Sequence, residues 1–323
     1  MKTAYLILAH NNPAHLQELV DALQTDHSAC FVHIDKKPEI GNFQSLHGPH
    51  VSFTNQRISV HWGDFSTIEA TLVLIRQALE DPLHFQRMVL LSGTDYPLRS
   101  AWDIESFFRR YPRDEFINIV KMPASRERKP MWRLTTPRFS SPQDPFITTL
   151  IRKIGVRIGI GKFLRTRSYR KHFKQLTPYA GDQWWALTRD ACLYILNFIE
   201  KEHGIYKFFR YTRLPDEMFF QIILGNSVFR VNMRRNLTYV DWGRDIISSH
   251  PAWITEDHLD NLFDSDLSFD SEELYGQGPI FFARKFSDEH GFLIDEVKRH
   301  IDHREKNKHI NHPNSQTGSD LQI

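Results

Sequence analysis

The sequence is poor in the features that usually mark a membrane-spanning protein, a secreted protein, or a protein that binds nucleic acid or an acidic partner. Its 323 residues contain two cysteines, Cys30 and Cys192, and both lie in apolar runs, which is typical of reduced core residues in a cytosolic protein. The formal net charge is +2, so there is no overall case for nucleic acid or an acidic partner. The first apolar run, which ends before His10, is too short to span a membrane, and no small-residue cleavage site follows it.

Several motifs with well-understood chemistry are also missing. There is no G-x-x-x-x-G-K-[ST] phosphate loop, no C-x-x-C, no G-x-S-x-G elbow, and no H-E-x-x-H among the 17 histidines. The segment "GVRIGIGK" (155–162) lacks the strand-turn-helix context of a dinucleotide-binding motif. The D-x-D at 264–266 lies in an acidic, loop-like run, so we expect solvated surface there and no metal site.

Apolar runs alternate with amphipathic segments along the chain. The predicted strands lie at 3–9, 30–35, 51–56, 87–93, 116–120, 237–242 and 280–286, with a strand and then a helix over 181–199. The other predicted helices begin at Pro13 behind an Asn12 N-cap, at Ser66 with Glu69 completing a capping box, at 216, and near 255. This alternation predicts an α/β fold with a mainly parallel sheet, in which ligands sit beyond the carboxyl ends of the strands.

No clean linker divides the chain, so one domain is expected over 1–304, followed by a disordered tail over 305–323. Residues 121–180 form a variable loop region, and its part at 152–174 carries many cations and almost no acids. A solvated basic loop is the simpler interpretation of 152–174, and contact with a membrane surface or an anionic ligand is the alternative.

One short stretch, "LPDEMFFQIIL" (214–224), raises a specific question about chemistry. Asp216 and Glu217 follow a proline and precede an apolar run. Acidic residues are ordinary at the start of a helix, where they complement the helix dipole. From the residues alone, a helix-start glutamate in a salt bridge is therefore the default interpretation, and a catalytic carboxylate is the alternative.

Seven fragments, taken in order, resemble one enzyme family. They are "AHNNPAHLQELVDAL…CFVHIDKK", "RISVHWGDFSTIEATLVLI", "LLSGTDYPL", "GDQWWALTR", "PDEMFFQIIL", "YVDW" and "FFARKF". Together they resemble the core-2/I-branching β-1,6-N-acetylglucosaminyltransferases and peptide O-xylosyltransferases, glycosyltransferase family 14, over roughly residues 3–290. The resemblance implies a GT-A glycosyltransferase fold with a Rossmann-like mixed sheet. It also implies a nucleotide-binding half over 1–120 and an acceptor-binding and catalytic half over 121–304.

The resemblance further implies inverting transfer from a UDP-sugar without a divalent metal or other cofactor. Glu217 matches the family's catalytic base, and aromatic neighbours such as Phe219 and Phe220 are expected to raise its pKa. Arg284 and Lys285 match the basic pair that neutralises the departing UDP. Some relatives add an arginine upstream, where this sequence has Ala252 and Trp253, so that contact is missing or is supplied by Arg244.

The remaining site residues come from the same comparison of motifs. Asp35 matches a strand-end acid near the nucleoside, and Arg57 matches a basic residue before the "WG" segment. Asp95 stands where metal-using relatives carry D-x-D, and either contacts the donor or caps a turn. Gln183 and Trp184 are expected beside the UDP-sugar. The expected acceptor-binding residues, which match family positions in "YVDW" and after the "MP" dipeptide, are Trp242, Arg126 and Lys129.

The sequence therefore predicts a bacterial-type glycosyltransferase that moves N-acetylglucosamine (GlcNAc) or xylose to a hydroxyl group of a glycan or lipid-linked glycan. It would act in the synthesis of a surface polysaccharide or glycoconjugate. The expected location is cytoplasmic, with peripheral contact to the inner membrane face through 152–174. Nucleic acid is not an expected partner, because the rest of the chain is near neutral. The alternative is a carbohydrate- or nucleotide-binding protein on the same fold that catalyses nothing.

Overall fold

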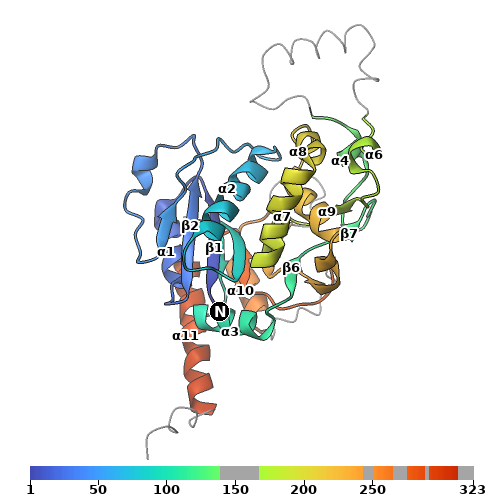
Figure 1. The fold of residues 1–323 in the computed structure, drawn as a ribbon. Coiled ribbons are helices and arrows are strands. Elements are labelled where there is room, and N and C mark those ends of the chain that lie inside the picture. Colours follow the sequence, from blue (N-terminus) through green and yellow to red (C-terminus); the bar gives the residue numbers. More distant parts are fainter. Residues whose placement is uncertain (139–166, 243–250, 265–274, 288–290, 312–323) are drawn as a thin grey trace, which may run out of the picture.

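The structure is a computed structural model that describes residues 1–138, 167–242, 251–264, 275–287 and 291–311. Its centre is a seven-stranded sheet with the order β10-β6-β9-β4-β1-β2-β3. Neighbouring strands run parallel except at β9, which is antiparallel to both β4 and β6. This mostly parallel sheet with flanking helices confirms the predicted α/β fold class (Figure 1).

The strands of the large sheet are β1 (Thr3–Ala9), β2 (Ser28–Ile34), β3 (Val51–Phe53), β4 (Arg87–Ser92), β6 (Glu115–Ile117), β9 (Trp185–Thr188) and β10 (Met233–Arg234). A three-stranded sheet has the order β11-β12-β5, with β5 (Tyr96–Pro97), β11 (Thr238–Val240) and β12 (Phe282–Arg284). A two-stranded ribbon pairs β7 (Val120–Lys121) with β8 (Tyr179–Ala180).

The helices are α1 (Pro13–Leu23), α2 (Ser66–Glu80), α3 (Ala101–Arg110), α4 (Trp132–Thr135), α6 (Arg170–Phe173), α7 (Arg189–Lys201), α8 (His203–Phe209), α9 (Phe219–Gly225), α10 (Glu256–Asp264) and α11 (Gly291–Asn311). Three short 3₁₀ turns are η1 (Ile40–Phe43), η3 (Pro215–Glu217) and η4 (Val228–Asn232). Within the described ranges, no helix is long and apolar enough to cross a membrane.

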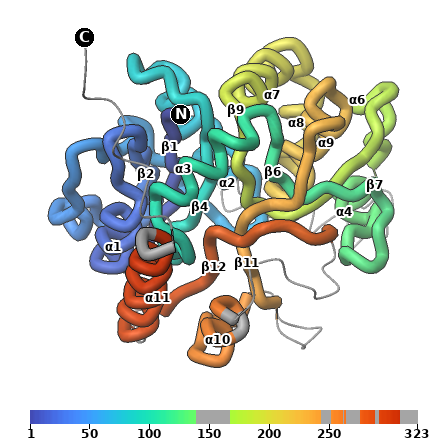
Figure 2. The backbone as a smooth tube through the Cα atoms, turned by 90° about the horizontal axis from the view of Figure 1, so that it is seen from below, coloured from blue at the N-terminus to red at the C-terminus, as the bar shows by residue number. Residues whose placement is uncertain are grey.

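The large sheet is covered on both faces, and β1 shows how. Ala4 and Leu6 pack in one core with residues of α2, α7 and α9, whereas Tyr5 and Ile7 pack in a second core with α1 and α3. A strand that is buried on both faces consists of a continuous apolar run, as "TAYLILA" does. A third core joins β12, α10 and α11, which Figure 2 shows gathered on one side of the molecule. Both cysteines are buried and free, as expected.

The helix starts agree only in part with the sequence. Asn12 does cap α1, since its side chain accepts the backbone N–H of His15 at 3.1 Å. The predicted capping box at Ser66 is wrong, because α2 already includes Ser66 and the hydroxyl accepts the N–H of His61 instead. The helix predicted from 216 begins only at Phe219 and is preceded by the turn η3.

Two other segments differ from the prediction. The strand expected over 116–120 divides into β6 and β7 of different sheets. Asn118 lies between them, and its side chain donates to Asp182 and accepts the N–H of Asn236. Residues 305–311, expected to begin a disordered tail, belong to α11, which extends beyond the body of the molecule (Figure 1). Contacts of Lys298 with α1 and of Lys308 with α3 hold this helix. Residues 312–323 lie outside the described part.

The antiparallel strand β9 has a well-fixed register. Leu90 pairs with Trp185 and Arg87 with Thr188, so β9 enters the sheet beside the carboxyl end of β4 and leaves it beside the start of β4. At the exit, fully buried Glu115 accepts hydrogen bonds from N and Oγ1 of Thr188 at 2.8 and 2.5 Å. The segment that precedes β9 therefore lies at the same edge as the carboxyl ends of the parallel strands.

Candidate active site

The carboxyl ends of β1 and β4 approach each other closely at the edge of the sheet. The N–H of Gly93 donates to Leu8 at 2.8 Å, and a Cβ on Gly93 would lie 2.9 Å from the Cβ of Ala9. Only glycine fits this approach, because any side chain would push the two strand ends apart. The turn after β4 consequently carries Asp95 directly into the edge where ligands bind in such sheets.

Asp95 is fully buried and faces Arg284 of β12. Its Oδ2 accepts the N–H of Ser92 at 2.8 Å, and its Oδ1 lies 3.5 Å from Nη1 of Arg284. Burial raises the pKa of Asp95 to about 6, although the guanidinium opposes this shift. Burial likewise lowers the pKa of Arg284, and Asp95 opposes that shift. The acid therefore acts as the counter-charge that allows an arginine to be held inside the site.

Trp184 holds the same guanidinium from another side. The Cζ atom of Arg284 lies 4.0 Å from the centroid of the indole, and Trp184 is itself buried. A cation over the face of a buried indole is attracted by the ring quadrupole, and the planar guanidinium also stacks well. The structure thus shows Trp184 orienting Arg284, and its predicted contact with the UDP-sugar stays a prediction.

Lys285 has a similar but more open arrangement with a second tryptophan. Its Nζ lies 4.1 Å from the ring centroid of Trp253, and its carbonyl accepts the N–H of Ile254 at 2.9 Å. Burial and then the neighbouring Arg284 lower the pKa of Lys285. Trp253 thus occupies the segment where some relatives carry an arginine, and here it supports the lysine. Arg244, the suggested replacement, lies outside the described residues.

Glu217 ends the 3₁₀ turn η3 and is held by two cations from far upstream in the chain. Nζ of Lys129 donates to Oε2 at 2.5 Å, and Nη1 of Arg133 donates to the same oxygen. All three side chains are largely buried, with 15% of Glu217, 6% of Lys129 and 11% of Arg133 exposed. Burial alone would raise the pKa of Glu217, but the two cations outweigh it and hold the pKa below its usual value.

The raised pKa that the sequence predicted for Glu217 is therefore wrong. Phe219 and Phe220 do follow the carboxylate in sequence, but both are buried in the core against other aromatic rings. Lys129, expected to touch the acceptor, contacts Glu217 and lies 3.6 Å from Asp182, and its contact with the acceptor stays a prediction. The salt bridge that the simpler interpretation predicted for Glu217 is present.

Asp216 has the opposite electrostatic environment from its neighbour. Burial, and then the charge of Glu217, raise the pKa of Asp216 to about 7. Its Oδ1 is buried and makes no hydrogen bond within the described part of the chain. Adjacent carboxyl groups whose pKa values are driven apart suit different tasks, so Glu217 is the one that stays ionised at neutral pH.

The segment 181–184 connects the Glu217 cluster with the Arg284 cluster. The N–H of Gly181 donates to the carbonyl of Glu217 at 2.8 Å, and Asp182 lies beside Lys129. Two residues later, Trp184 lies under Arg284. Half-buried Gln183 stands between them. The turn that carries Glu217 and the side chain of Arg284 thus contact the two ends of one four-residue segment at the entry to β9.

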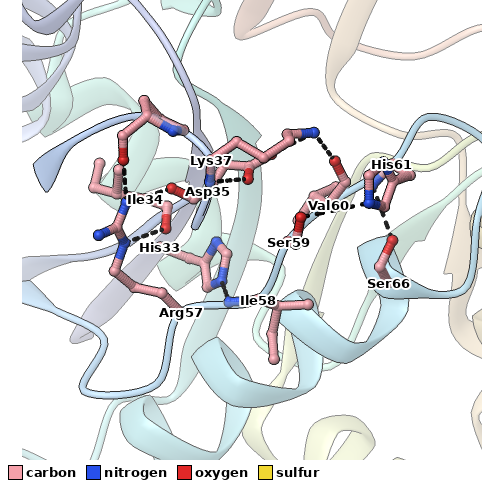
Figure 3. Close-up of polar contacts among 11 residues, drawn as sticks. His33, Ile34, Asp35, Lys37, Arg57, Ile58, Ser59, Val60, His61 and Ser66 are labelled. Atoms are coloured by element: carbon pink, nitrogen blue, oxygen red, sulfur yellow. Dashed lines mark hydrogen bonds and ion pairs between the residues drawn. The ribbon is translucent and has the colours of Figure 1, made fainter. Parts of the chain in front are cut away.

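Asp35 and Arg57 are brought together at the carboxyl end of β2 (Figure 3). Asp35 accepts the N–H of Lys37 at 2.9 Å and lies 3.1 Å from the Nζ of that lysine. Arg57 donates to three backbone carbonyls, those of Ile34, Asp35 and Pro38, at 3.1, 2.6 and 2.6 Å. Arg57 therefore holds the loop after β2 in place. Its contact with UDP stays a prediction.

The remaining predicted acceptor residues lie on the surface. Trp242 is 43% exposed and follows β11, whose Val240 pairs with Arg284, so it lies just beyond the cationic pair. Arg126 is exposed in the hairpin that ends at Lys129. Of the basic segment 152–174, residues 152–166 lie outside the described part, and the rest includes the short helix α6.

Comparison with known proteins gives the family. The sequence model described as "Branch: Core-2/I-Branching enzyme" matches residues 3–264. The chain belongs to this family. Xylosyltransferase 1 of Rattus norvegicus is 24% identical over 257 residues, which is 76% of this chain and 28% of that protein. Xylosyltransferase 1 of Canis lupus familiaris is 25% identical over 264 residues, 76% of this chain and 25% of that protein.

This member of the Core-2/I-branching family thus spans about a quarter of the length of those relatives. Among solved structures, apo mouse xyloside xylosyltransferase 1 is 10% identical and covers 87% of this chain and 97% of its own. Its TM-score of 0.34 is too low to support any argument. The family and the curated relatives indicate a glycosyltransferase, and they confirm the predicted family, for which the GT-A fold class was expected.

Three contacts of the site were not visible in the sequence. Arg133 and Asp182 join the Glu217 cluster, and burial raises the pKa of Tyr275, with further contributions from Asp182 and Glu217.

Among the described residues, no group of three or more His, Cys, Asp or Glu side chains is arranged for a metal. A separate cavity of about 620 Å³, lined in part by Arg109 and Arg189, lies at the opposite end of the sheet.

Proposed function

We propose that this member of the Core-2/I-branching family is an inverting glycosyltransferase that uses a UDP-sugar. It would transfer GlcNAc or xylose to a hydroxyl group of a glycan or lipid-linked glycan during the synthesis of a surface polysaccharide or glycoconjugate. The observation that carries the proposal is the segment 181–184. One end of this segment bonds the turn that carries Glu217, whose carboxylate stays ionised, and the other end packs against Arg284, the neighbour of Lys285.

Inversion at an anomeric carbon proceeds in one displacement, so a base must accept the proton of the attacking hydroxyl. Glu217 is proposed as that base. Its lowered pKa keeps it ionised at neutral pH, and its position in a turn fixed to Gly181 keeps the carboxylate at the edge of the sheet. Asp216, with a pKa near 7, is less suited because a large fraction of it carries a proton at neutral pH.

The leaving group develops negative charge as the sugar–phosphate bond breaks. Arg284 and Lys285 are proposed to bind the diphosphate, where preorganised cations stabilise the departing UDP without a divalent metal. Asp95 and Trp184 would keep the guanidinium in place before the donor arrives. Asp35, Arg57 and Gln183 are proposed to face the nucleoside and the donor sugar, and Trp242 and Arg126 the acceptor.

Location is a separate part of the proposal. We place the protein in the cytoplasm, with the cations of 152–174 making peripheral contact with the inner membrane face, where lipid-linked acceptors would be found. Sedimentation with anionic lipid vesicles tests this contact. Binding that does not depend on salt concentration or on lipid charge would contradict it.

The test uses purified protein, UDP-GlcNAc or UDP-xylose, and a panel of glycan acceptors, with and without EDTA. The Glu217→Gln variant should bind UDP as the parent does but lose transfer by roughly 10²–10⁴-fold, the usual contribution of a general base. Glu296→Gln, a change in an exposed pair of α11, is the matched control and should transfer normally. Retained turnover in Glu217→Gln would remove this base, and loss of activity in EDTA would contradict metal independence. UDP binding without transfer by the parent protein would favour the non-catalytic alternative.

A further inference from the structure

Both cations on Glu217 are directed at the same oxygen atom. Lys129 and Arg133 each donate to Oε2, and the hydrogen bonds that the described residues make to this carboxylate all end there. A carboxylate has two oxygens that can each accept a proton. Fixing one of them by two donors defines the plane of the group and therefore the direction in which the other oxygen points.

We propose that Arg133 is a positioning residue for the base. Together with Lys129 it fixes Oε2 of Glu217 and turns Oε1 toward the acceptor hydroxyl. The inference rests on the proposed function, in which Glu217 accepts a proton. In that step the acceptor oxygen forms a bond to the anomeric carbon while its proton passes to Oε1. The sugar–phosphate bond breaks at the same time, and UDP leaves with the electron pair.

The burial of this contact separates it from an ordinary surface ion pair. Only 11% of the Arg133 side chain and 15% of the Glu217 side chain are exposed. A buried ion pair adds little net stability, because the cost of removing both charges from water offsets their attraction. The fold nevertheless presents Arg133 firmly, because α4 is anchored by Leu134, which is fully buried in the core.

Three other titratable groups lie around Glu217. Burial raises the pKa values of Asp216 and Tyr275, the charge of Glu217 adds to both shifts, and Asp182 contacts Lys129. The two cations are therefore the groups that favour the ionised carboxylate. Removing the charge of Arg133 should raise the pKa of Glu217 and protonate the base at a higher pH.

The experiment compares the pH dependence of kcat/KM in four proteins: the parent, Arg133→Met, Arg133→Lys and the control Arg299→Met. The control removes an arginine that pairs with Glu296 on the exposed face of α11, where 71% of the arginine is exposed. We expect the acid limb of Arg133→Met to move to higher pH by about one unit, the lower end of the effect of a close opposite charge. Arg133→Lys should keep the acid limb of the parent, because the lysine retains the charge, and should lose kcat, because its shorter, flexible side chain fixes Oε2 less firmly than the planar guanidinium does. Arg299→Met should match the parent.

Thermal unfolding and UDP binding establish that each variant is folded. An unchanged acid limb in Arg133→Met, or a change confined to the KM for the acceptor, would overturn the positioning inference. Should Arg133→Met fail to fold, unchanged kcat in Arg133→Lys would overturn it equally. These results differ from failure of the proposed function, which would appear as full activity in Glu217→Gln.

Discussion

The buried pair of Asp95 and Arg284 makes the stability of the protein depend on pH in a way that one substitution isolates. Asp95 is fully buried, and its pKa is about 6 against an ordinary value of 3.8. The folded protein therefore keeps a proton on Asp95 at pH values where the unfolded chain has already released it. Because this folded-state pKa is raised, Asp95 lowers the free energy of unfolding as the pH rises through this window.

The size of the effect follows from the two pKa values. The full shift corresponds to about 3 kcal/mol, of which about 2 kcal/mol falls between pH 4.5 and 7.5. Asparagine has a similar shape and does not titrate in this range. From pH 4.5 to 7.5, the unfolding free energy of the parent should therefore fall by about 2 kcal/mol relative to that of Asp95→Asn. Other titrating groups, Glu217 included, cancel in this difference.

The assay is urea unfolding followed by circular dichroism at several pH values, at constant ionic strength. The pH slope of the difference is the quantity that tests the argument, because neutralising Asp95 also leaves Arg284 without its counter-charge and shifts all values by a constant. A difference that stays constant within about 0.5 kcal/mol would refute the reasoning. It would mean that Arg284 and the N–H of Ser92 hold Asp95 ionised at its ordinary pKa.

Two further predictions concern the donor side. Trp184→Leu should weaken UDP binding by about tenfold, since it removes a buried cation–π contact worth about 1–2 kcal/mol, whereas Trp253→Leu, at a half-exposed ring, should weaken it by about threefold. Calorimetric titration with UDP measures both, and a larger effect at Trp253 would contradict the ranking. Arg57→Met should lower the unfolding free energy by about 2 kcal/mol, because three backbone carbonyls lose their donor. An unchanged denaturation midpoint would show that this loop does not depend on Arg57.

The parts of the fold that were predictable are those with a local signal. The runs that became β1, β2 and β4 are apolar because both faces of the sheet are covered, and the Asn12-Pro13 pair marks a helix start by itself. The missed helix α11 packs Leu293, Ile294 and Val297 of its first half in the third core, and the rest of the helix is highly charged. Distant partners hold it, among them Glu18 and Asp103, and no local pattern reveals those.

The candidate site also has a part that the sequence predicts and a part that it does not. Glu217, Arg284 and Lys285 could be named because the order of fragments points to a family, which the comparisons confirm. Their roles stay predictions. The electrostatic state of Glu217 could not be derived, since Lys129 and Arg133 lie 88 and 84 residues away in sequence. Neighbours in sequence suggested a raised pKa, and neighbours in space lower it.

The two hydrogen bonds between Glu115 and Thr188 have a consequence for the site at the other end of β9. A shift of β9 by one residue along β4 would move both Trp184 and Asp182 to the other face of the sheet. A shift by two residues would carry them about 7 Å from their partners. Neither shift is compatible with a buried carboxylate that must satisfy both donors of one threonine. The placement of Asp182 beside Lys129 and of Trp184 beside Arg284 thus depends on a hydrogen-bonded pair at the opposite end of β9.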